Sequence, residues 1–198
     1  MNPPRTGTDP IATPPAREVS AYNIANALTV ARLLLVPVFV ACLFAGGTGW
    51  RVAALVVFVV ASVTDLLDGE LARRRNLVTD FGKIADPIAD KALTGAALVS
   101  LSITGELPWW VTIVILAREI GITLLRFFVI NHGVIPASYG GKVKTVLQII
   151  GIVLYVAPGV PYVLRWPVML VAVAITVATG LDYVVRAWRL RRRAKKGE

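Results

Sequence analysis

The stretch from Asp65 to Asp90, DLLDGELARRRNLVTDFGKIADPIAD, decides how this chain folds and where its chemistry lies. It sets four aspartates, at positions 65, 68, 86 and 90, among long apolar runs. A carboxylate at the centre of a membrane helix costs about 2.5–3.5 kcal/mol on insertion scales. Four of them cannot be left without a cationic partner, so the stretch is predicted to hold the site of reaction.

The surrounding composition is that of a membrane protein. Of the 198 residues 56% are hydrophobic, and the mean hydropathy is +0.69, whereas a soluble domain is about 45–50% apolar even when glycine is counted. A membrane-spanning helix needs about 20 mostly apolar residues, and the apolar runs are continuous, which favours helices over a barrel. The sequence therefore predicts an all-α membrane protein with six transmembrane helices, over about 28–45, 51–72, 83–104, 108–131, 143–158 and 163–187.

The charge pattern predicts the orientation of these helices. The net charge is +9, but the cations gather in alternate connections (73–83 and 132–144) and at the C-terminus, so we expect no nucleic-acid partner. Only Arg51 and Arg165 lie in the other connections, which also carry interfacial aromatic residues: Trp50, Trp109, Trp110, Tyr162 and Trp166. By the positive-inside rule both termini and the basic connections face the cytoplasm. A multi-pass protein of the cell (inner or plasma) membrane is predicted.

The ends of the chain differ from this membrane domain, which we place at 18–188. Residues 1–17 contain five prolines and are predicted to be a disordered tail. Residues 19–27 have a mixed pattern that favours a short interfacial helix, with continuation of the tail as the alternative. Residues 189–198 form a basic cytoplasmic tail. The single Cys42 excludes an internal disulfide and a thiolate metal site.

The four aspartates are predicted to form one site. If the second span ends near Arg73 and the third begins near Gly82, the two helices are antiparallel neighbours. Both acidic pairs then lie within roughly 12 Å of the cytoplasmic ends, and each pair shares a helix face because its members are i,i+3 or i,i+4. Carboxylates without thiol or imidazole suit Mg²⁺ or Mn²⁺, and a pair of such ions suits phosphoryl displacement.

Two other interpretations of the acids stay open at this point. The first is structural ion pairing with Arg73, Lys83 and Lys91. The second is a cation pathway through a transporter. An acidic relay would have to continue across the membrane, but the sequence places Glu106 alone at the far face and Asp182 near the end of the last helix.

The run resembles the signature of the CDP-alcohol phosphatidyltransferases, D-x2-D-G-x2-A-R-x8-G-x3-D-x3-D. All fixed positions are present: Asp65, Asp68, Gly69, Ala72, Arg73, Gly82, Asp86 and Asp90. The resemblance implies a six-helix membrane fold, a homodimer and a site that faces the cytoplasm. It also implies transfer of a phosphatidyl group from CDP-diacylglycerol to an alcohol, with release of CMP.

The resemblance also implies roles for individual residues. Asp65, Asp68, Asp86 and Asp90 match metal ligands for two Mg²⁺ or Mn²⁺ ions, and Asp90 also matches the general base. The positions that match contacts with CDP-diacylglycerol are Asn26, Thr29, Asp68, Gly69, Arg73 and Thr79. For Asn26 and Thr29, capping of the first helix is the alternative.

A second group of cations predicts an acceptor that carries its own phosphate. Arg118 and Arg126 lie in the fourth apolar span, and Lys142 and Lys144 begin the fifth. A local pair between Arg118 and Glu119 is disfavoured, since adjacent helical residues do not face each other. The lysines have a further alternative, which is snorkelling to lipid headgroups.

The segments around these cations, 118–126 and 141–145, resemble the phosphatidylglycerophosphate synthase branch of the family, with glycerol 3-phosphate as acceptor. The same chemistry on inositol phosphate, or on phosphatidylglycerol to make cardiolipin, remains an alternative.

Overall fold

The computed structural model describes the backbone of residues 24–75, 80–129 and 139–194, and the side chains of residues 28–64, 91–125 and 141–189. Within these residues the chain is all-helical, without a strand, as predicted. Each predicted apolar segment corresponds to one helix: α1 (Ile24–Ala45), α2 (Thr48–Arg75), α3 (Asp80–Ile103), α4 (Trp109–Val129), α5 (Tyr139–Val156) and α6 (Tyr162–Ala194). The predicted tail at 1–17 lies outside the described residues.

The connection between α2 and α3 is shorter than the signature suggested. We expected helix ends near Arg73 and Gly82, but α2 continues to Arg75 and α3 begins at Asp80, so four residues separate them. Arginine is a good helix former, and no proline or glycine lies between Gly69 and Gly82 to stop either helix. The spacing within the signature thus includes the last turn of one helix and the first turn of the next.

The two outer ends of the helical region also differ from the prediction. α1 begins at Ile24, so residues 24–27 belong to the first helix and do not form a separate interfacial helix. Residues 19–23 lie outside the described part of the chain. At the other end α6 runs through to Ala194, so the basic segment that starts at Arg189 begins as a continuation of the last helix.

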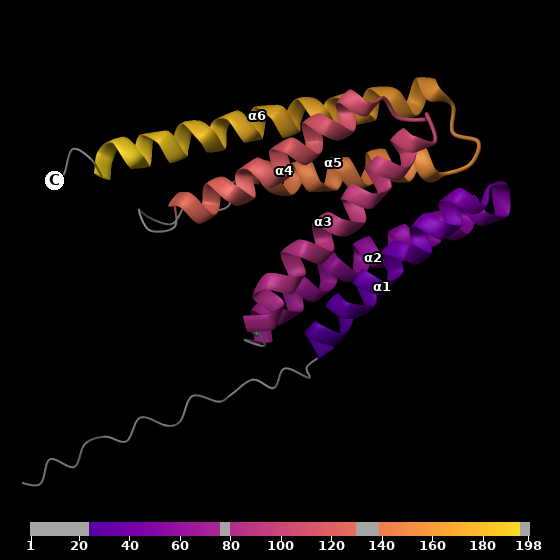
Figure 1. Cartoon of the computed structure of the whole chain (residues 1–198), viewed down its shortest axis with the longest axis horizontal. Coiled ribbons are helices and arrows are strands. Elements are labelled where there is room, and N and C mark those ends of the chain that lie inside the picture. The colour runs from indigo at the N-terminus through magenta and orange to yellow at the C-terminus, as the bar shows by residue number, and fades with distance from the viewer. Residues whose placement is uncertain (1–23, 76–79, 130–138, 195–198) are drawn as a thin grey trace, which may run out of the picture.

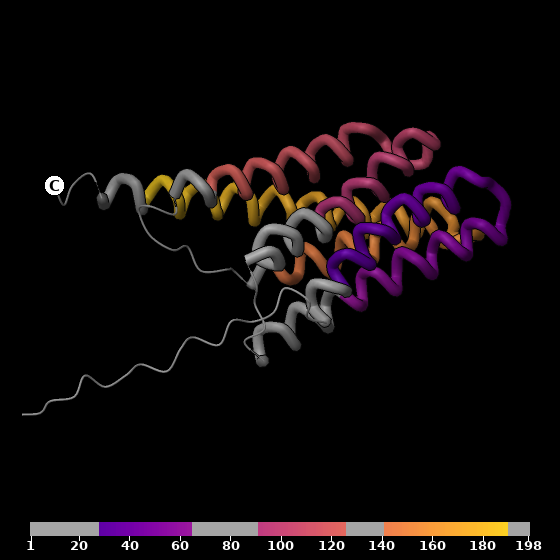
Figure 2. The backbone as a smooth tube through the Cα atoms, turned by 60° about the horizontal axis from the view of Figure 1, so that its bottom comes forward, coloured from indigo at the N-terminus to yellow at the C-terminus, as the bar shows by residue number. Residues whose placement is uncertain are grey.

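The helices run alternately up and down. The connections α1–α2, α3–α4 and α5–α6 lie together at one end of the molecule, on the right in Figures 1 and 2. The first residues of α1, α3 and α5 and the last residues of α2, α4 and α6 lie toward the other end (Figure 1). The signature aspartates belong to this second end, which the charge pattern predicts to be cytoplasmic.

The turn after α3 shows how the sequence ends a helix here. Gly105 adopts a left-handed conformation with φ of 73°, which costs little without a Cβ. The Gly105 amide donates to the Ser102 carbonyl at 3.1 Å, and the Glu106 amide donates to the Leu101 carbonyl at 3.0 Å. This is the Schellman pattern. It reverses the chain and carries Glu106 out of the helix at the predicted outer end.

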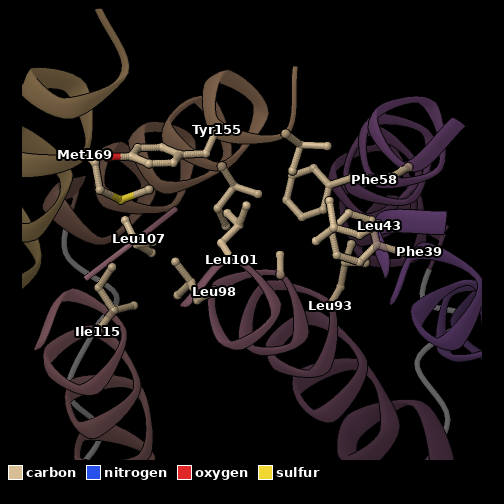
Figure 3. Packing of buried hydrophobic residues seen from close by; sticks show 14 of the residues in the cluster. Phe39, Leu43, Phe58, Leu93, Leu98, Leu101, Leu107, Ile115, Tyr155 and Met169 are labelled. Atoms are coloured by element: carbon tan, nitrogen blue, oxygen red, sulfur yellow. The ribbon is translucent and has the colours of Figure 1, made fainter. Parts of the chain in front are cut away.

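The core joins both halves of the bundle. Phe39 of α1 packs against Phe58 of α2, with ring centroids 5.6 Å apart. Leu98 and Leu101 of α3 occupy the middle of the cluster (Figure 3). The remaining labelled side chains, all buried, come from α1, α3, α4, α5, α6 and the α3–α4 turn: Leu43, Leu93, Leu107, Ile115, Tyr155 and Met169.

Large apolar side chains also cover the outside of the bundle. Leu34, Val163 and Leu181 are 65%, 78% and 63% exposed, and apolar surface on this scale fits a lipid-facing protein. Two segments, Leu28–Ala45 and Tyr162–Arg189, are long and apolar enough to cross a bilayer by length and composition, and two shorter apolar segments lie at Thr48–Thr64 and Lys91–Ile103.

Glu106 is not alone, contrary to the sequence-based expectation. Arg51 Nη1 and Nη2 donate to its two carboxylate oxygens at 2.7 and 2.6 Å, and Arg165 Nη1 donates to Oε2 at 3.0 Å. Arg51 also donates to the carbonyls of Tyr155 and Val156 at the end of α5. Glu106 therefore ties together the first turns of α2 and α6 and, through Arg51, the last turn of α5. The expectation was wrong because Arg51, Glu106 and Arg165 lie at three different outer connections, and the sequence does not show that these connections meet in space.

This cluster predicts a pH-dependent stability. Burial raises the pKa of Glu106, but the hydrogen bonds and charges of Arg51 and Arg165 outweigh it and hold the pKa below its ordinary 4.5. A lowered pKa stabilises the folded state above pH 4.5, and that stability is lost as the pH falls through the lower, folded-state value. Glu106→Gln should cost about 1.5–3 kcal/mol at neutral pH, the range for a charge-assisted hydrogen bond. Thermal unfolding in detergent should show the gap between variant and parent closing at acid pH. A gap that is equal at neutral and acid pH would contradict the assignment.

Candidate active site

The signature aspartates lie on two helix segments whose ends are close. Asp65 lies ten residues before the end of α2 at Arg75, and Asp90 lies ten residues after the start of α3 at Asp80. At about 1.5 Å per residue both are roughly 15 Å from their helix ends. The four-residue connection spans at most about 18 Å, so the two ends are neighbours (Figure 1).

The equal depth of the two acidic pairs is thus supported at the level of the backbone. Asp68 and Asp86 lie seven and six residues from the same helix ends. Gly69 and Arg73 belong to the same part of α2. The side chains of these residues are outside the described set, as is the whole of Thr79. Among the described side chains no group of three or more potential metal ligands gathers.

The first helix contributes buried polar residues near this end. Thr29 is 3% exposed, and as the sixth residue of α1 it lies too far inside the helix to be its cap. The capping alternative is therefore wrong for Thr29. Arg32, one turn further along, is also 3% exposed. Sequence reasoning did not single out its role, although an arginine in a long apolar run is a signal in itself. Asn26 is described only by its place in the first turn of α1.

Two of the four predicted acceptor cations meet at Glu119, which was not predicted to belong to the site. Glu119 Oε1 accepts a hydrogen bond from Lys144 Nζ of α5 and one from Arg118 Nη1 at 3.2 Å. The side chains of Arg118, Glu119 and Lys144 are 16%, 17% and 5% exposed. The prediction that adjacent Arg118 and Glu119 do not pair is wrong. Both side chains are long enough to meet although they are adjacent on α4.

The last helix fixes the other side of Arg118. Its Nη2 donates to Thr179 Oγ1 at 3.3 Å, and the Thr179 hydroxyl in turn donates to the Ile175 carbonyl at 2.7 Å. Gly180 leaves room for the arginine stem, since a Cβ there would lie 3.1 Å from Arg118 Cγ. The guanidinium is thus held between Glu119 of α4 and Thr179 of α6.

A second contact joins this cluster to the helix of the third and fourth aspartates. Lys91, which directly follows Asp90 in α3, donates a hydrogen bond to Thr123 of α4. The Thr123 hydroxyl donates to the Glu119 carbonyl at 2.8 Å. Lys91 therefore contacts α4 through Thr123, and Thr123 connects α3 to the turn that carries Glu119.

The structure does not bring every predicted acceptor residue into this cluster. Lys142 is exposed, two positions before the buried Lys144 on α5. Arg126 lies two turns beyond Arg118 on α4, and its side chain is outside the described set. Arg118 and Lys144 are the predicted pair that the structure places together.

Comparisons with known proteins agree with the motif. The family model described as CDP-alcohol phosphatidyltransferase matches residues 22–178. A probable phosphatidylglycerophosphate synthase of Mycobacterium tuberculosis (strain ATCC 25618 / H37Rv) is 52% identical over 172 residues, which covers 84% of this chain and 82% of that protein.

Two relatives carry the name CDP-diacylglycerol–glycerol-3-phosphate 3-phosphatidyltransferase. The one from Bacillus subtilis (strain 168) is 37% identical over 185 residues, covering 84% of this chain and 96% of the relative. The one from Escherichia coli (strain K12) is 41% identical over 137 residues, covering 66% and 75%. On the family match and these identities, the chain belongs to the CDP-alcohol phosphatidyltransferase family.

Proposed function

We propose that this enzyme transfers the phosphatidyl group of CDP-diacylglycerol to sn-glycerol 3-phosphate, which gives phosphatidylglycerophosphate and CMP in phospholipid biosynthesis. One observation supports the acceptor above all: the half-buried Arg118 and the buried Lys144 come from two helices and meet at the Glu119 carboxylate, and Lys91, which follows Asp90, reaches the next turn of the Glu119 helix. A phosphate on the acceptor needs such a pair, because guanidinium and ammonium groups bind phosphate oxygens. The names of the relatives support the same acceptor.

The carboxylates suit a pair of divalent cations. Asp65, Asp68, Asp86 and Asp90 supply only oxygen atoms, which are the ligands that Mg²⁺ and Mn²⁺ prefer. Their backbone positions at matched depth on neighbouring helix ends are compatible with one shared site. When bound, two such ions would neutralise the charge of the pyrophosphate and stabilise the attacking and leaving oxygens.

The chain's own residues carry the remaining steps. Asn26, Thr29, Gly69, Arg73 and Thr79 hold the CDP part of the donor. Asp90 accepts the proton of the acceptor's primary hydroxyl as that oxygen attacks the β-phosphorus. The new phosphorus–oxygen bond forms as the bond to CMP breaks, and CMP leaves with the electron pair. Arg73 stabilises the charge that develops on the leaving phosphate.

A cation transporter with an acidic site would share the apolar helices but would consume no nucleotide. Purified protein with CDP-diacylglycerol and glycerol 3-phosphate should release CMP in equal amount to the lipid product, and only when both substrates are present. Ion flux through proteoliposomes without CMP release would support the transporter. The alternative acceptors, inositol phosphate and phosphatidylglycerol, would preserve CMP release and change the lipid product.

Removal of divalent cations is expected to stop the reaction. The four aspartates offer hard oxygen ligands to a metal ion and no soft ones. Excess chelator should therefore abolish turnover, and added Mg²⁺ or Mn²⁺ should restore it. The measurement is CMP release before and after the metal is added back. Full turnover in excess chelator would refute the two-metal proposal.

We also propose that all six helices cross the cell membrane, with both termini and the site on the cytoplasmic side. The ion pairs of Glu106 with Arg51 and Arg165 support this orientation, because Glu106 offsets one of the two cations at the outer end and leaves the excess of positive charge on the cytoplasmic side. The exposed Trp50, Trp109 and Trp110 lie at that end, as interfacial anchors do. A homodimer is proposed on the family resemblance alone.

Cysteine labelling in intact cells tests this orientation. In a background where Cys42 is replaced by serine, Val78→Cys should react only with a membrane-permeant reagent, because the basic connection faces the cytoplasm. The matched control is Thr48→Cys at the exposed start of α2, which should react with an impermeant reagent. The reverse pattern would invert the topology.

A further inference from the structure

Glu119 occupies the place where an anionic acceptor is expected to bind. One of its oxygens, Oε1, accepts hydrogen bonds from both Arg118 and Lys144. These are the two cations, Lys144 buried and Arg118 half-buried, that the proposed function assigns to the acceptor phosphate. A negatively charged group of the protein itself is therefore already bound to them.

The burial of the cluster explains why a carboxylate is needed there. Lys144 is 5% exposed and Arg118 is 16% exposed, so neither charge is fully solvated. Two buried cations at one point repel each other, and a buried charge without a partner is strongly destabilising. Glu119 removes this repulsion when no substrate is bound.

Residues around Arg118, Glu119 and Lys144 hold the Arg118 guanidinium and the Glu119 backbone in place. Thr179 Oγ1 accepts from Arg118 Nη2 at 3.3 Å, and Thr123 fixes the Glu119 carbonyl at 2.8 Å. The backbone of Glu119 is thus anchored, while its carboxylate reaches the cations through a side chain with three rotatable bonds. The carboxylate can turn away without disturbing α4.

The charge balance determines which ligand can replace it. Arg118, Lys144 and Glu119 together carry a net charge of +1. A phosphate dianion brings two negative charges to the two cations, whereas the Glu119 carboxylate brings one. A neutral alcohol offers no charge to compete with Glu119. The cluster is therefore suited to a dianionic phosphate ester, and ligands without that charge leave the carboxylate bound.

We propose that Glu119 is an internal counter-anion that occupies the acceptor-phosphate position in the empty enzyme and is displaced by the incoming phosphate. Glu119 is thus a positioning and specificity residue. The proposal rests on the proposed function, since it takes Arg118 and Lys144 as the acceptor site. It predicts that Glu119 competes with phosphate, whereas a residue that helps to bind phosphate would do the opposite.

The test is the inhibition of turnover by inorganic phosphate against glycerol 3-phosphate. In Glu119→Gln the competing charge is gone but the side chain keeps its size. The inhibition constant of phosphate should fall by about tenfold or more, since each factor of ten requires only about 1.4 kcal/mol of lost repulsion. The KM for glycerol 3-phosphate should fall with it, and the KM for CDP-diacylglycerol should not change. Asp182→Asn, a half-exposed acid on α6 that pairs with Arg186, is the matched control and should leave all three constants unchanged.

Thermal unfolding provides a second readout. Glu119→Gln should melt lower than the parent without phosphate, because Arg118 and Lys144 lose the carboxylate that they share, and phosphate should raise its melting temperature more than that of the parent. If this variant does not fold, Glu119→Asp keeps the charge on a shorter stem, and its phosphate inhibition constant should also fall. An unchanged or higher phosphate inhibition constant in the variant tested would overturn the counter-anion proposal. If phosphate does not compete with glycerol 3-phosphate in the parent enzyme, the proposed acceptor site itself is wrong.

Discussion

Replacement of Asp65, Asp68 or Asp86 by asparagine is expected to abolish phosphatidyl transfer while the protein still inserts into the membrane. Asparagine has nearly the same shape but lacks the charge, and Mg²⁺ or Mn²⁺ held by carboxylates loses most of its affinity when a charged oxygen is removed. The three positions lie at the matched, neighbouring ends of α2 and α3, so each loss affects the same site. The measurement is CMP release by purified variants at saturating donor and acceptor.

Asp182→Asn is the control for this series as well. Asp182 is half-exposed, and its partner Arg186 lies one turn away on the same helix. Its replacement should leave CMP release close to that of the parent, since exposed pairs of this kind contribute about 0.3–0.5 kcal/mol. If any of the three signature variants keeps more than a few per cent of activity, that aspartate is not an essential metal ligand.

Truncation of Arg118 or Lys142 to alanine is expected to impair the use of the acceptor, glycerol 3-phosphate, far more than the use of the donor, CDP-diacylglycerol. A hydrogen bond to a charged group contributes about 1.5–3 kcal/mol, so loss of one contact should lower kcat/KM for glycerol 3-phosphate roughly 10- to 150-fold. The KM for CDP-diacylglycerol should stay near its original value, since Arg73 and the carboxylates serve the donor. Arg186→Ala, at an exposed position of α6, is the matched control.

The two truncations differ in what the structure supports. Arg118 is held in the cluster by Glu119 and Thr179, whereas Lys142 is exposed, so the larger effect is expected for Arg118. Gly180→Ala offers an independent change, because the new Cβ would force the arginine stem to move by a few tenths of an ångström. It should raise the KM for glycerol 3-phosphate, while Gly121→Ala on the open side of α4 should not. Equal losses for both substrates would assign Arg118 to the donor or to folding.

The sequence predicted the helical architecture well, because continuous apolar runs are a strong and local signal. The six predicted segments correspond to α1–α6. The end of α2 and the start of α3 were misplaced, since arginine and aspartate can prolong a helix beyond its apolar part. The number of helices that cross the membrane stays a prediction, because within the described side chains two segments meet a simple criterion of length and hydropathy.

The ion pairs could not be predicted from spacing alone. Glu106 pairs with Arg51 and Arg165, which are 55 and 59 residues away along the chain. Glu119 pairs with Lys144 across two helices. Such contacts depend on how helices rotate and cross, which short-range periodicity does not specify. The motif predicts the carboxylate site more directly, because its eight fixed positions lie within one continuous stretch, 65–90.

The most direct test of this account is one assay with the purified full-length protein. CDP-diacylglycerol is offered with glycerol 3-phosphate, inositol phosphate or phosphatidylglycerol in turn, and the lipid product is identified by mass. We predict phosphatidylglycerophosphate with glycerol 3-phosphate, equimolar CMP, and no comparable product with the other two acceptors. Efficient product formation from inositol phosphate or phosphatidylglycerol, without turnover of glycerol 3-phosphate, would contradict the assigned acceptor.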